Sequence, residues 1–209
     1  VSLRYVDSVR RLGRPDLIIL PGSKSTMDDL DWMSRQGLAA RVVQHAQEGH
    51  PVIGICGGYQ MLGKSISDPY GVERGGDMAG LRLLETGTTF AREKTRKQVQ
   101  GRLPAMAGVF APLSRMPYEG YEIHMGETDG GCQTANVWGS YVHGLFDRHE
   151  IVAALIRALC MHKGIDPLPV QAVDVRAYKE TQYDLLAGGI RAALDMKMLY
   201  NIIEKGHRP

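Results

Sequence analysis

Short apolar runs alternate along the chain with longer segments in which apolar and polar residues recur at helical spacing. The runs at residues 16–20 and 51–56 are too short for helices and end in Pro-Gly or Gly-Gly pairs, which predicts two buried parallel strands. Residues 25–50 have helical spacing, and Gly37 is placed to divide them into two helices. This alternation of strands and helices predicts an α/β domain with a mainly parallel sheet.

The pattern changes in the second half of the chain. Residues 69–118 are rich in Gly, Pro and charged residues and alternate over short stretches, which predicts antiparallel strands. Further short strands are predicted at residues 120–126, 134–140 and 141–147. Residues 149–164 form an amphipathic pattern typical of a helix, and residues 175–205 predict one or two helices with a break at Gly188-Gly189.

Composition argues against several classes of protein: those that bind nucleic acid or membranes, and those built on disulfides or zinc. The 209 residues allow one domain, residues 1–209, and the net charge of +2 gives no strong attraction to nucleic acid or a membrane surface. We find neither an apolar run of about 20 residues, the length that crosses a bilayer, nor a signal-peptide pattern at the N-terminus. The three cysteines have no paired spacing, which argues against a disulfide framework or a zinc site. We expect a reduced, cytoplasmic protein with no metal.

Cys56 stands where a nucleophile would be exposed. It follows the second apolar strand and precedes Gly57-Gly58, at the predicted start of a helix. A residue at such a sharp strand-to-helix turn is directed outward, and glycines on either side avoid clashes in the strained turn. Free helix N–H groups would favour the thiolate and lower the pKa of the thiol. The alternative is an inert core thiol, as free cysteines often are.

A catalytic thiol needs a basic partner, and two histidines are candidates. His124 and His143 each lie in a short strand-like stretch followed by glycine, from which either could enter a cleft at the strand ends. The residues alone leave both open. A nucleotide site is not indicated, because the loop at residues 20–26 lacks the glycine spacing of a phosphate-binding P-loop.

Five motifs in order, LPGSKST, GICGGYQMLG, EKTR, YEIHMG and YVHGLFD, resemble the glutaminase domain of the cobyric acid synthase family. This family belongs to the class I glutamine amidotransferases of the cobyrinic/cobyric acid type. The resemblance implies a flavodoxin-like, three-layer α/β fold with a mixed, mainly parallel sheet and helices on both faces. It also implies that Cys56 attacks the side-chain amide of glutamine and that His143 activates the thiol and protonates the departing ammonia.

The resemblance assigns further site residues. The N–H of Gly57, with an N–H of Gly22 or Ser23, would form the oxyanion hole, and Gln60 would hold the glutamine substrate. Many class I glutaminases carry Glu two residues after the histidine. This chain has Leu145 there, and the cobyric acid group likewise lacks the Glu.

Without that Glu, a carboxylate that orients His143 has to come from elsewhere. Glu122 is a candidate for this role, whereas His124 fits a structural position or one near a partner domain.

The family joins this domain to an ATP-binding synthetase domain that amidates a corrinoid. The resemblance therefore implies glutamine as substrate, no cofactor in this domain, and ATP and Mg²⁺ in the synthetase domain, which does not fit in 209 residues. The first strand of the glutaminase domain is expected to be missing from the chain.

Other assignments remain open. They are the glutaminase of cobyrinic acid a,c-diamide synthase or of a cell-wall lipid II amidating pair, a cysteine hydrolase, and a binding module with an inert cysteine.

Overall fold

A three-stranded parallel sheet forms the centre of the protein. The computed structural model describes residues 1–167 and 174–206. Its first sheet contains β1 (Ile18–Leu20), β2 (Val52–Ile55) and β7 (Val137–Ser140) in the order β1-β2-β7, all parallel. Every residue of β2 is buried, which explains why its sequence is an unbroken apolar run rather than an alternating one.

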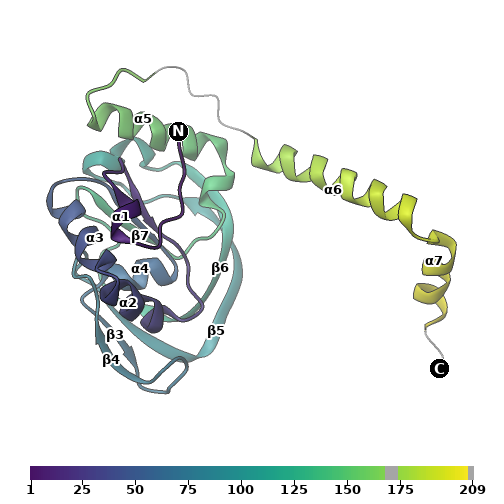
Figure 1. Ribbon diagram of the computed structural model, residues 1–209, viewed down its shortest axis with the longest axis horizontal. Helices are drawn as coiled ribbons and strands as arrows, with labels where there is room; N and C mark the ends of the chain where they lie inside the picture. Colours follow the sequence, from purple (N-terminus) through teal and green to yellow (C-terminus); the bar gives the residue numbers. More distant parts are fainter. Residues whose placement is uncertain (168–173, 207–209) are drawn as a thin grey trace.

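Helices cover both faces of this sheet. On one face, α2 (Thr26–Arg35) and α3 (Leu38–Gln47) pack their apolar residues against Val52 and Val137. On the other face, α5 (His149–His162) and the 3-10 helix η1 (Gly108–Leu113) enclose Ile53 and Trp138. The α/β class and the three layers are thus confirmed (Figure 1), and Gly37 does separate α2 from α3, with φ 72°.

A second sheet lies beyond the first. Its order is β4 (Gly76–Ala79), β3 (Ser65–Asp68), β5 (Gly87–Arg102) and β6 (Pro117–Thr128). Only β3 and β5 are parallel, and the other pairs are antiparallel, as the alternating pattern of this region predicted. Between the sheets, α4 (Gly57–Leu62) contacts β1, β2, β7 and β3.

Two local predictions were wrong. Residues 141–147 do not form a strand: His143 makes one isolated bridge to Tyr121, and the 3-10 helix η2 (Leu145–Asp147) follows. The tail does not break at Gly188-Gly189, because α6 (Val175–Ala193) runs through both glycines. The break comes at Asp195, whose side chain accepts a hydrogen bond from the Met198 N–H and caps α7 (Met196–Lys205).

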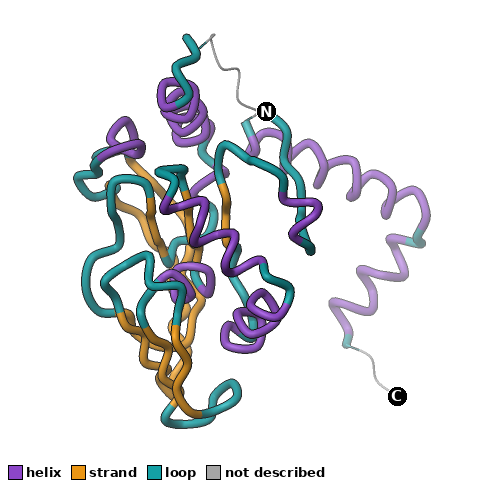
Figure 2. The backbone as a smooth tube through the Cα atoms, turned by 60° about the vertical axis from the view of Figure 1, so that its left-hand side comes forward, coloured by secondary structure: helices purple, strands orange, loops and turns teal. Residues whose placement is uncertain are grey.

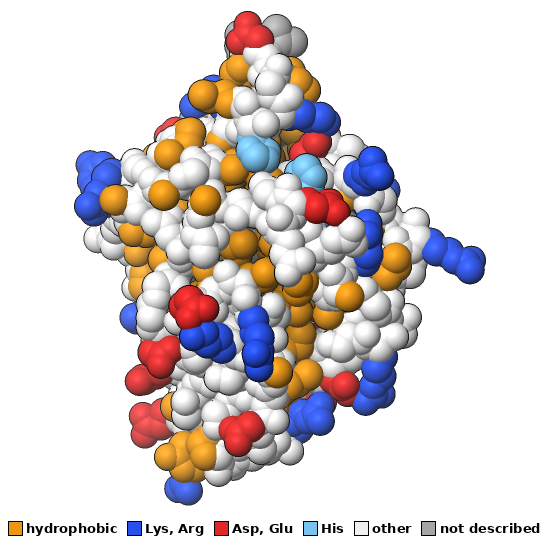
Figure 3. All heavy atoms as spheres, turned by 90° about the vertical axis from the view of Figure 1, so that its left-hand side faces the viewer, with side chains coloured by type: hydrophobic (Ala, Val, Ile, Leu, Met, Phe, Trp, Pro, Cys, Tyr) orange, Lys and Arg blue, Asp and Glu red, His pale blue; other side chains and the backbone are white. Residues whose placement is uncertain are grey.

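The remaining elements are peripheral. A short helix, α1 (Val9–Leu12), places Leu12 in the core near the start of β1. Helices α6 and α7 lie apart from the strands (Figures 1 and 2). Among the described residues, no helix combines the length and the apolar character that crossing a membrane requires. Figure 3 shows one face, on which charged side chains are scattered with hydrophobic ones exposed between them.

Candidate active site

Cys56 occupies a strained turn between β2 and α4. Its backbone has φ 52° and ψ −111°, a conformation that costs a non-glycine residue about 1–3 kcal/mol. Two backbone hydrogen bonds hold the turn: Cys56 N–H donates to Ser140 O (2.8 Å) and Gly58 N–H donates to Pro21 O (3.1 Å). A Cβ on Gly58 would lie 2.1 Å from Leu20 O, so only glycine lets the turn pack this closely on β1. The predicted elbow is therefore present.

The thiol is more buried than its position in the sequence suggests. Cys56 is 5% exposed, and its Sγ–H donates to the carbonyl of Ile123 on β6 at 3.4 Å. Burial raises the pKa of Cys56, while the Gly57 N–H and the charge of Lys94 act in the opposite direction and that of Glu73 adds to the rise. The expectation of a lowered thiol pKa was wrong, because desolvation outweighs the helix N-terminus.

His143 lies next to the same turn. A Cβ built on Gly22 would be 2.8 Å from His143 Cε1 and 3.5 Å from Cys56 Cβ, so the imidazole and the cysteine flank one glycine. The ring stacks on Tyr121, with centroids 5.1 Å apart and planes 7° apart, and the two backbones exchange hydrogen bonds. Burial, and then the neighbouring His124, lowers the pKa of His143, which favours the neutral base.

Backbone amides adjoin the thiol where an oxyanion hole was predicted. A Cβ on Gly57 would lie 2.9 Å from Ser23 N, so the β1–α2 loop and the start of α4 are in contact. Within the described part of the chain, neither the Ser23 nor the Gly57 N–H donates to a backbone or side-chain oxygen. Both donors can therefore meet an oxyanion that forms beside the thiol.

Gln60 ties three parts of the site together. Its Oε1 accepts from Thr26 Oγ1 (3.1 Å), and its Nε2 donates to Met125 O (2.9 Å) and Tyr141 Oη (3.2 Å). The side chain is 2% exposed and both amide donors are used. Gln60 therefore shapes the pocket by joining α2, α4 and β6, and only its Oε1 retains capacity for a ligand.

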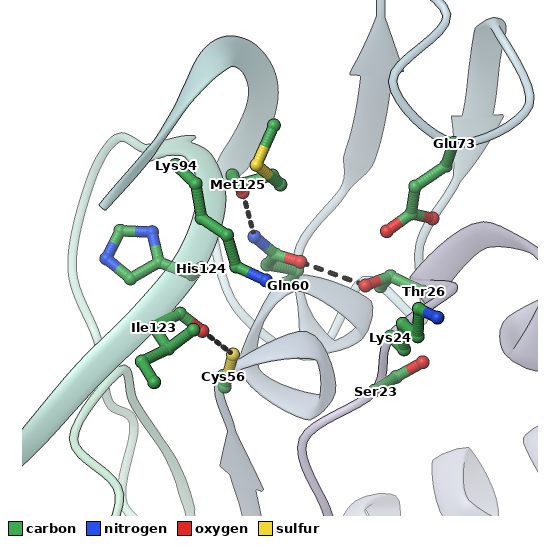
Figure 4. A pocket seen from close by; sticks show the side chains of 10 residues that line it. All are labelled: Ser23, Lys24, Thr26, Cys56, Gln60, Glu73, Lys94, Ile123, His124 and Met125. Carbon is green, nitrogen blue, oxygen red and sulfur yellow. Dashed lines mark hydrogen bonds between the residues drawn. The ribbon is translucent and has the colours of Figure 1, made fainter. Parts of the chain in front are cut away.

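A pocket opens beside Cys56, with about 340 Å³ of space that is continuous with solvent. Cys56 and Gln60 lie between its two walls (Figure 4). One wall carries Ser23, Lys24, Thr26 and Glu73, and the other carries Lys94, Ile123, His124 and Met125. His124 rather than His143 therefore lines this space, while His143 adjoins Cys56 across Gly22.

Glu122, expected to orient His143, contacts other residues instead. Its carboxylate pairs with Lys97 Nζ at 3.0 Å and approaches His124 Nε2 to 3.7 Å. Within the described residues, neither an ion pair nor a hydrogen bond joins Glu122 to His143. The orientation of the His143 ring comes instead from the stacked Tyr121 and the backbone bridge.

Two residues that line the pocket, and one that lies beside it, were given no role from the sequence. Glu73 lies in the β3–β4 loop, where its Oε2 accepts from the Met27 N–H at 3.0 Å. Lys94, which the sequence shows only as part of the EKTR motif, reaches the pocket from β5. Tyr141 stacks on His124 with centroids 3.8 Å apart. The EKTR motif was a signal for Lys94, whereas nothing local marks Glu73.

The curated relatives of this chain and the family model that matches it point to the same family. Curated relatives include cobyric acid synthases of Ruminiclostridium cellulolyticum, 45% identical over 98% of this chain, and Lachnoclostridium phytofermentans, 43% identical over 99%. That of Photorhabdus laumondii is 43% identical over the whole chain. The chain spans 44% to 46% of the length of these relatives.

One solved structure, described as a glutamine amidotransferase, is 14% identical. The superposition has a TM-score of 0.49 and covers 79% of this chain and 88% of the other chain. The model of the CobB/CobQ-like glutamine amidotransferase domain matches residues 1–151. This chain therefore belongs to the family of CobB/CobQ-like glutamine amidotransferase domains.

Proposed function

We propose that this chain is the glutaminase part of a cobyric acid synthase and that it releases ammonia from glutamine through a thioester on Cys56. The observation that carries the proposal is the strained turn of Cys56, which lines the pocket and, like the imidazole of His143, adjoins Gly22. Family membership and relatives named cobyric acid synthase support it.

The reaction begins with an uncharged pair. Neutral His143 accepts the thiol proton as Sγ attacks the Cδ carbonyl of glutamine, and the new oxyanion is met by the N–H groups of Ser23 or Gly22 and of Gly57. The imidazolium then returns the proton to the amide nitrogen, the C–N bond breaks, and ammonia leaves a glutamyl thioester. Water attacks the thioester with His143 again as base, which releases glutamate and restores the thiol.

The ammonia would serve a synthetase partner. In the proposed assembly, that partner uses ATP and Mg²⁺ to activate side-chain carboxylates of adenosylcobyrinic acid a,c-diamide, and ammonia converts them to amides in cobalamin biosynthesis. The relatives, about twice the length of this chain, leave room for such a partner. A cytoplasmic location fits this role.

Covalent labelling tests the proposal. The chain is treated with a diazoketone analogue of glutamine and analysed by intact and peptide mass spectrometry, beside a Cys56→Ser control. We expect one adduct on Cys56, suppressed by excess glutamine. His143→Ala is expected to slow labelling more than His124→Ala. A folded wild-type chain that takes no adduct would overturn the proposal.

A further inference from the structure

A carboxylate on one wall of the pocket, which also carries Lys24, lies opposite a lysine on the other wall. Glu73 reaches the pocket from the β3–β4 loop and Lys94 from β5, and Figure 4 shows them on opposite sides of Gln60. Both charges lie close enough to act on the Cys56 thiol, one raising and the other lowering its pKa. Neither residue belongs to the predicted catalytic set, so the walls need a separate explanation.

Glu73 is held in place by a buried carboxylate. Asp68, 1% exposed, accepts hydrogen bonds from the N–H groups of Val72, Glu73 and Gly75, all at 2.9 Å. This network fixes the loop, and the Met27 N–H then engages Oε2 of Glu73. Within the described residues, Oε1 of Glu73 accepts no hydrogen bond, so it can receive a cation from the pocket.

Lys94 lies at the end of a bulge in the pairing of β5 with β6. Thr89 pairs with Glu127 and Lys94 with Met125, so four residues of β5 are opposed by Gly126 alone. Gly126 has φ 86°, and a Cβ there would lie 2.5 Å from Thr89 O. Such a bulge bends its strand and redirects side chains. Lys94 enters no ion pair within the described part of the chain.

We propose that Glu73 and Lys94 select free glutamine, with Glu73 binding its α-ammonium and Lys94 its α-carboxylate while the side-chain amide meets Cys56. The proposal rests on the proposed glutaminase function. A free amino acid carries both charges on one carbon, whereas a glutamine residue inside a peptide carries neither. Two opposite charges beside the thiol therefore favour the free amino acid and disfavour peptides, whose entry would leave both charges desolvated and unpaired.

Binding of truncated ligands tests the assignment residue by residue. Glutamine, glutaramic acid (no α-ammonium) and 4-aminobutanamide (no α-carboxylate) are titrated by NMR into the Cys56→Ser chain, which cannot turn them over. Glu73→Gln should weaken the binding of glutamine and of 4-aminobutanamide by roughly tenfold or more and leave the binding of glutaramic acid unchanged. Lys94→Met should weaken the binding of glutamine and of glutaramic acid to a similar extent and leave the binding of 4-aminobutanamide unchanged.

Matched controls come from an exposed ion pair, Lys64 with Glu85. Lys64→Met and Glu85→Gln should bind all three ligands as the parent does. If Lys24→Met, rather than Lys94→Met, weakens the binding of glutamine and glutaramic acid, the assignment of Lys94 is wrong. If Glu73→Gln and Lys94→Met bind like the parent while wild-type Cys56 is still labelled by the diazoketone, the inference fails and the glutaminase function stands. Absence of labelling would instead overturn the function itself.

Discussion

At the scale of single residues, Cys56 and His143 are held as an uncharged pair. Burial is the largest influence on both groups: it raises the pKa of the thiol and lowers that of the imidazole. A preformed thiolate–imidazolium pair would need the opposite shifts. In the proposed mechanism, the nucleophile is therefore generated as substrate binds and the proton moves to His143.

The pH dependence of alkylation follows from this arrangement. The rate at which iodoacetamide modifies Cys56 should rise with pH through an inflection above that of a free cysteine, about 8.5. Lys94→Met should move the inflection higher and Glu73→Gln lower, because Lys94 lowers the thiol pKa and Glu73 raises it. Peptide mass spectrometry separates Cys56 from Cys132 and Cys160. An inflection below pH 7 would contradict the uncharged pair.

Gly22 offers a test of the placement of His143. The Gly22→Ala side chain would approach His143 Cε1 to 2.8 Å, so the ring must move away from Cys56. We expect kcat for glutamate release to fall by roughly a hundredfold, with little change in the free energy of unfolding. Gly131→Ala is the control, since a Cβ there meets nothing within 4 Å. Equal activity of the two variants would show that His143 is not positioned through Gly22.

At the scale of elements, the loop that carries Glu73 depends on the ionisation of Asp68. Burial raises the pKa of this carboxyl, but the N–H groups of Glu73, Gly75, Val72 and Tyr70 together hold it below its usual value. A lowered folded-state pKa contributes stability above the unfolded value of about 3.9, and this stability is lost as the pH falls through the folded-state pKa.

Asp68→Asn should lower the free energy of unfolding by about 2 kcal/mol at pH 7, because an amide cannot accept three N–H groups as a carboxylate does. Urea unfolding at a series of pH values measures this difference, which should shrink below pH 4. Asp77→Asn, an exposed change on the neighbouring strand, serves as control. A difference that stays constant from pH 7 to pH 3 would rule out the charge of Asp68 as its source.

Local pattern predicted most elements, and its failures have physical causes. The helices around Gly37 and at residues 149–162 have strong periodicity and clear ends. The tail break was misplaced because glycines in an exposed helix cost only about 1 kcal/mol each, whereas Asp195 supplies a cap. Residues 141–147 resembled a strand, but pairing is limited to the bridge between Tyr121 and His143.

The site was predictable where it lies at the carboxyl ends of the two predicted parallel strands. Cys56, Gly57 and the loop at Gly22 lie together because consecutive parallel strands end at one edge. Glu73 depends on a loop organised by a buried carboxylate, and Lys94 on a bulge opposite Gly126. These are tertiary arrangements without a local pattern, so sequence reasoning gave neither the lysine nor the glutamate a role.

At the scale of the whole molecule, the two last helices stand apart from the layered body. In α6 and α7 the described side chains are at least partly exposed, and apolar ones such as Tyr183, Leu186 and Ile203 face solvent. Within the described residues, the ion pair between Lys179 and Asp147 (2.5 Å) joins α6 to the body. Because exposed ion pairs contribute little, the body should be stable without this segment.

A chain ending at Pro167 tests this independence. It should unfold at the same urea midpoint as the full chain and label at Cys56 at the same rate, since the site and both cores lie before residue 168. Its helical circular dichroism should be lower. Lys179→Met in the full chain is the control for the ion pair. A lower midpoint in the shortened chain would mean that α6 or α7 packs against the body in solution.

The conformation of Cys56 has a consequence for the history of such chains. A left-handed backbone at a residue with a side chain opposes folding by about 1–3 kcal/mol, and glycine would remove that cost. Under the proposed function, the chemistry of the thiol is the reason for retaining this residue. In a lineage that no longer uses glutamine, a substitution to glycine at this position would increase stability and be free to spread. A relative with three consecutive glycines here would thus carry the mark of a lost activity.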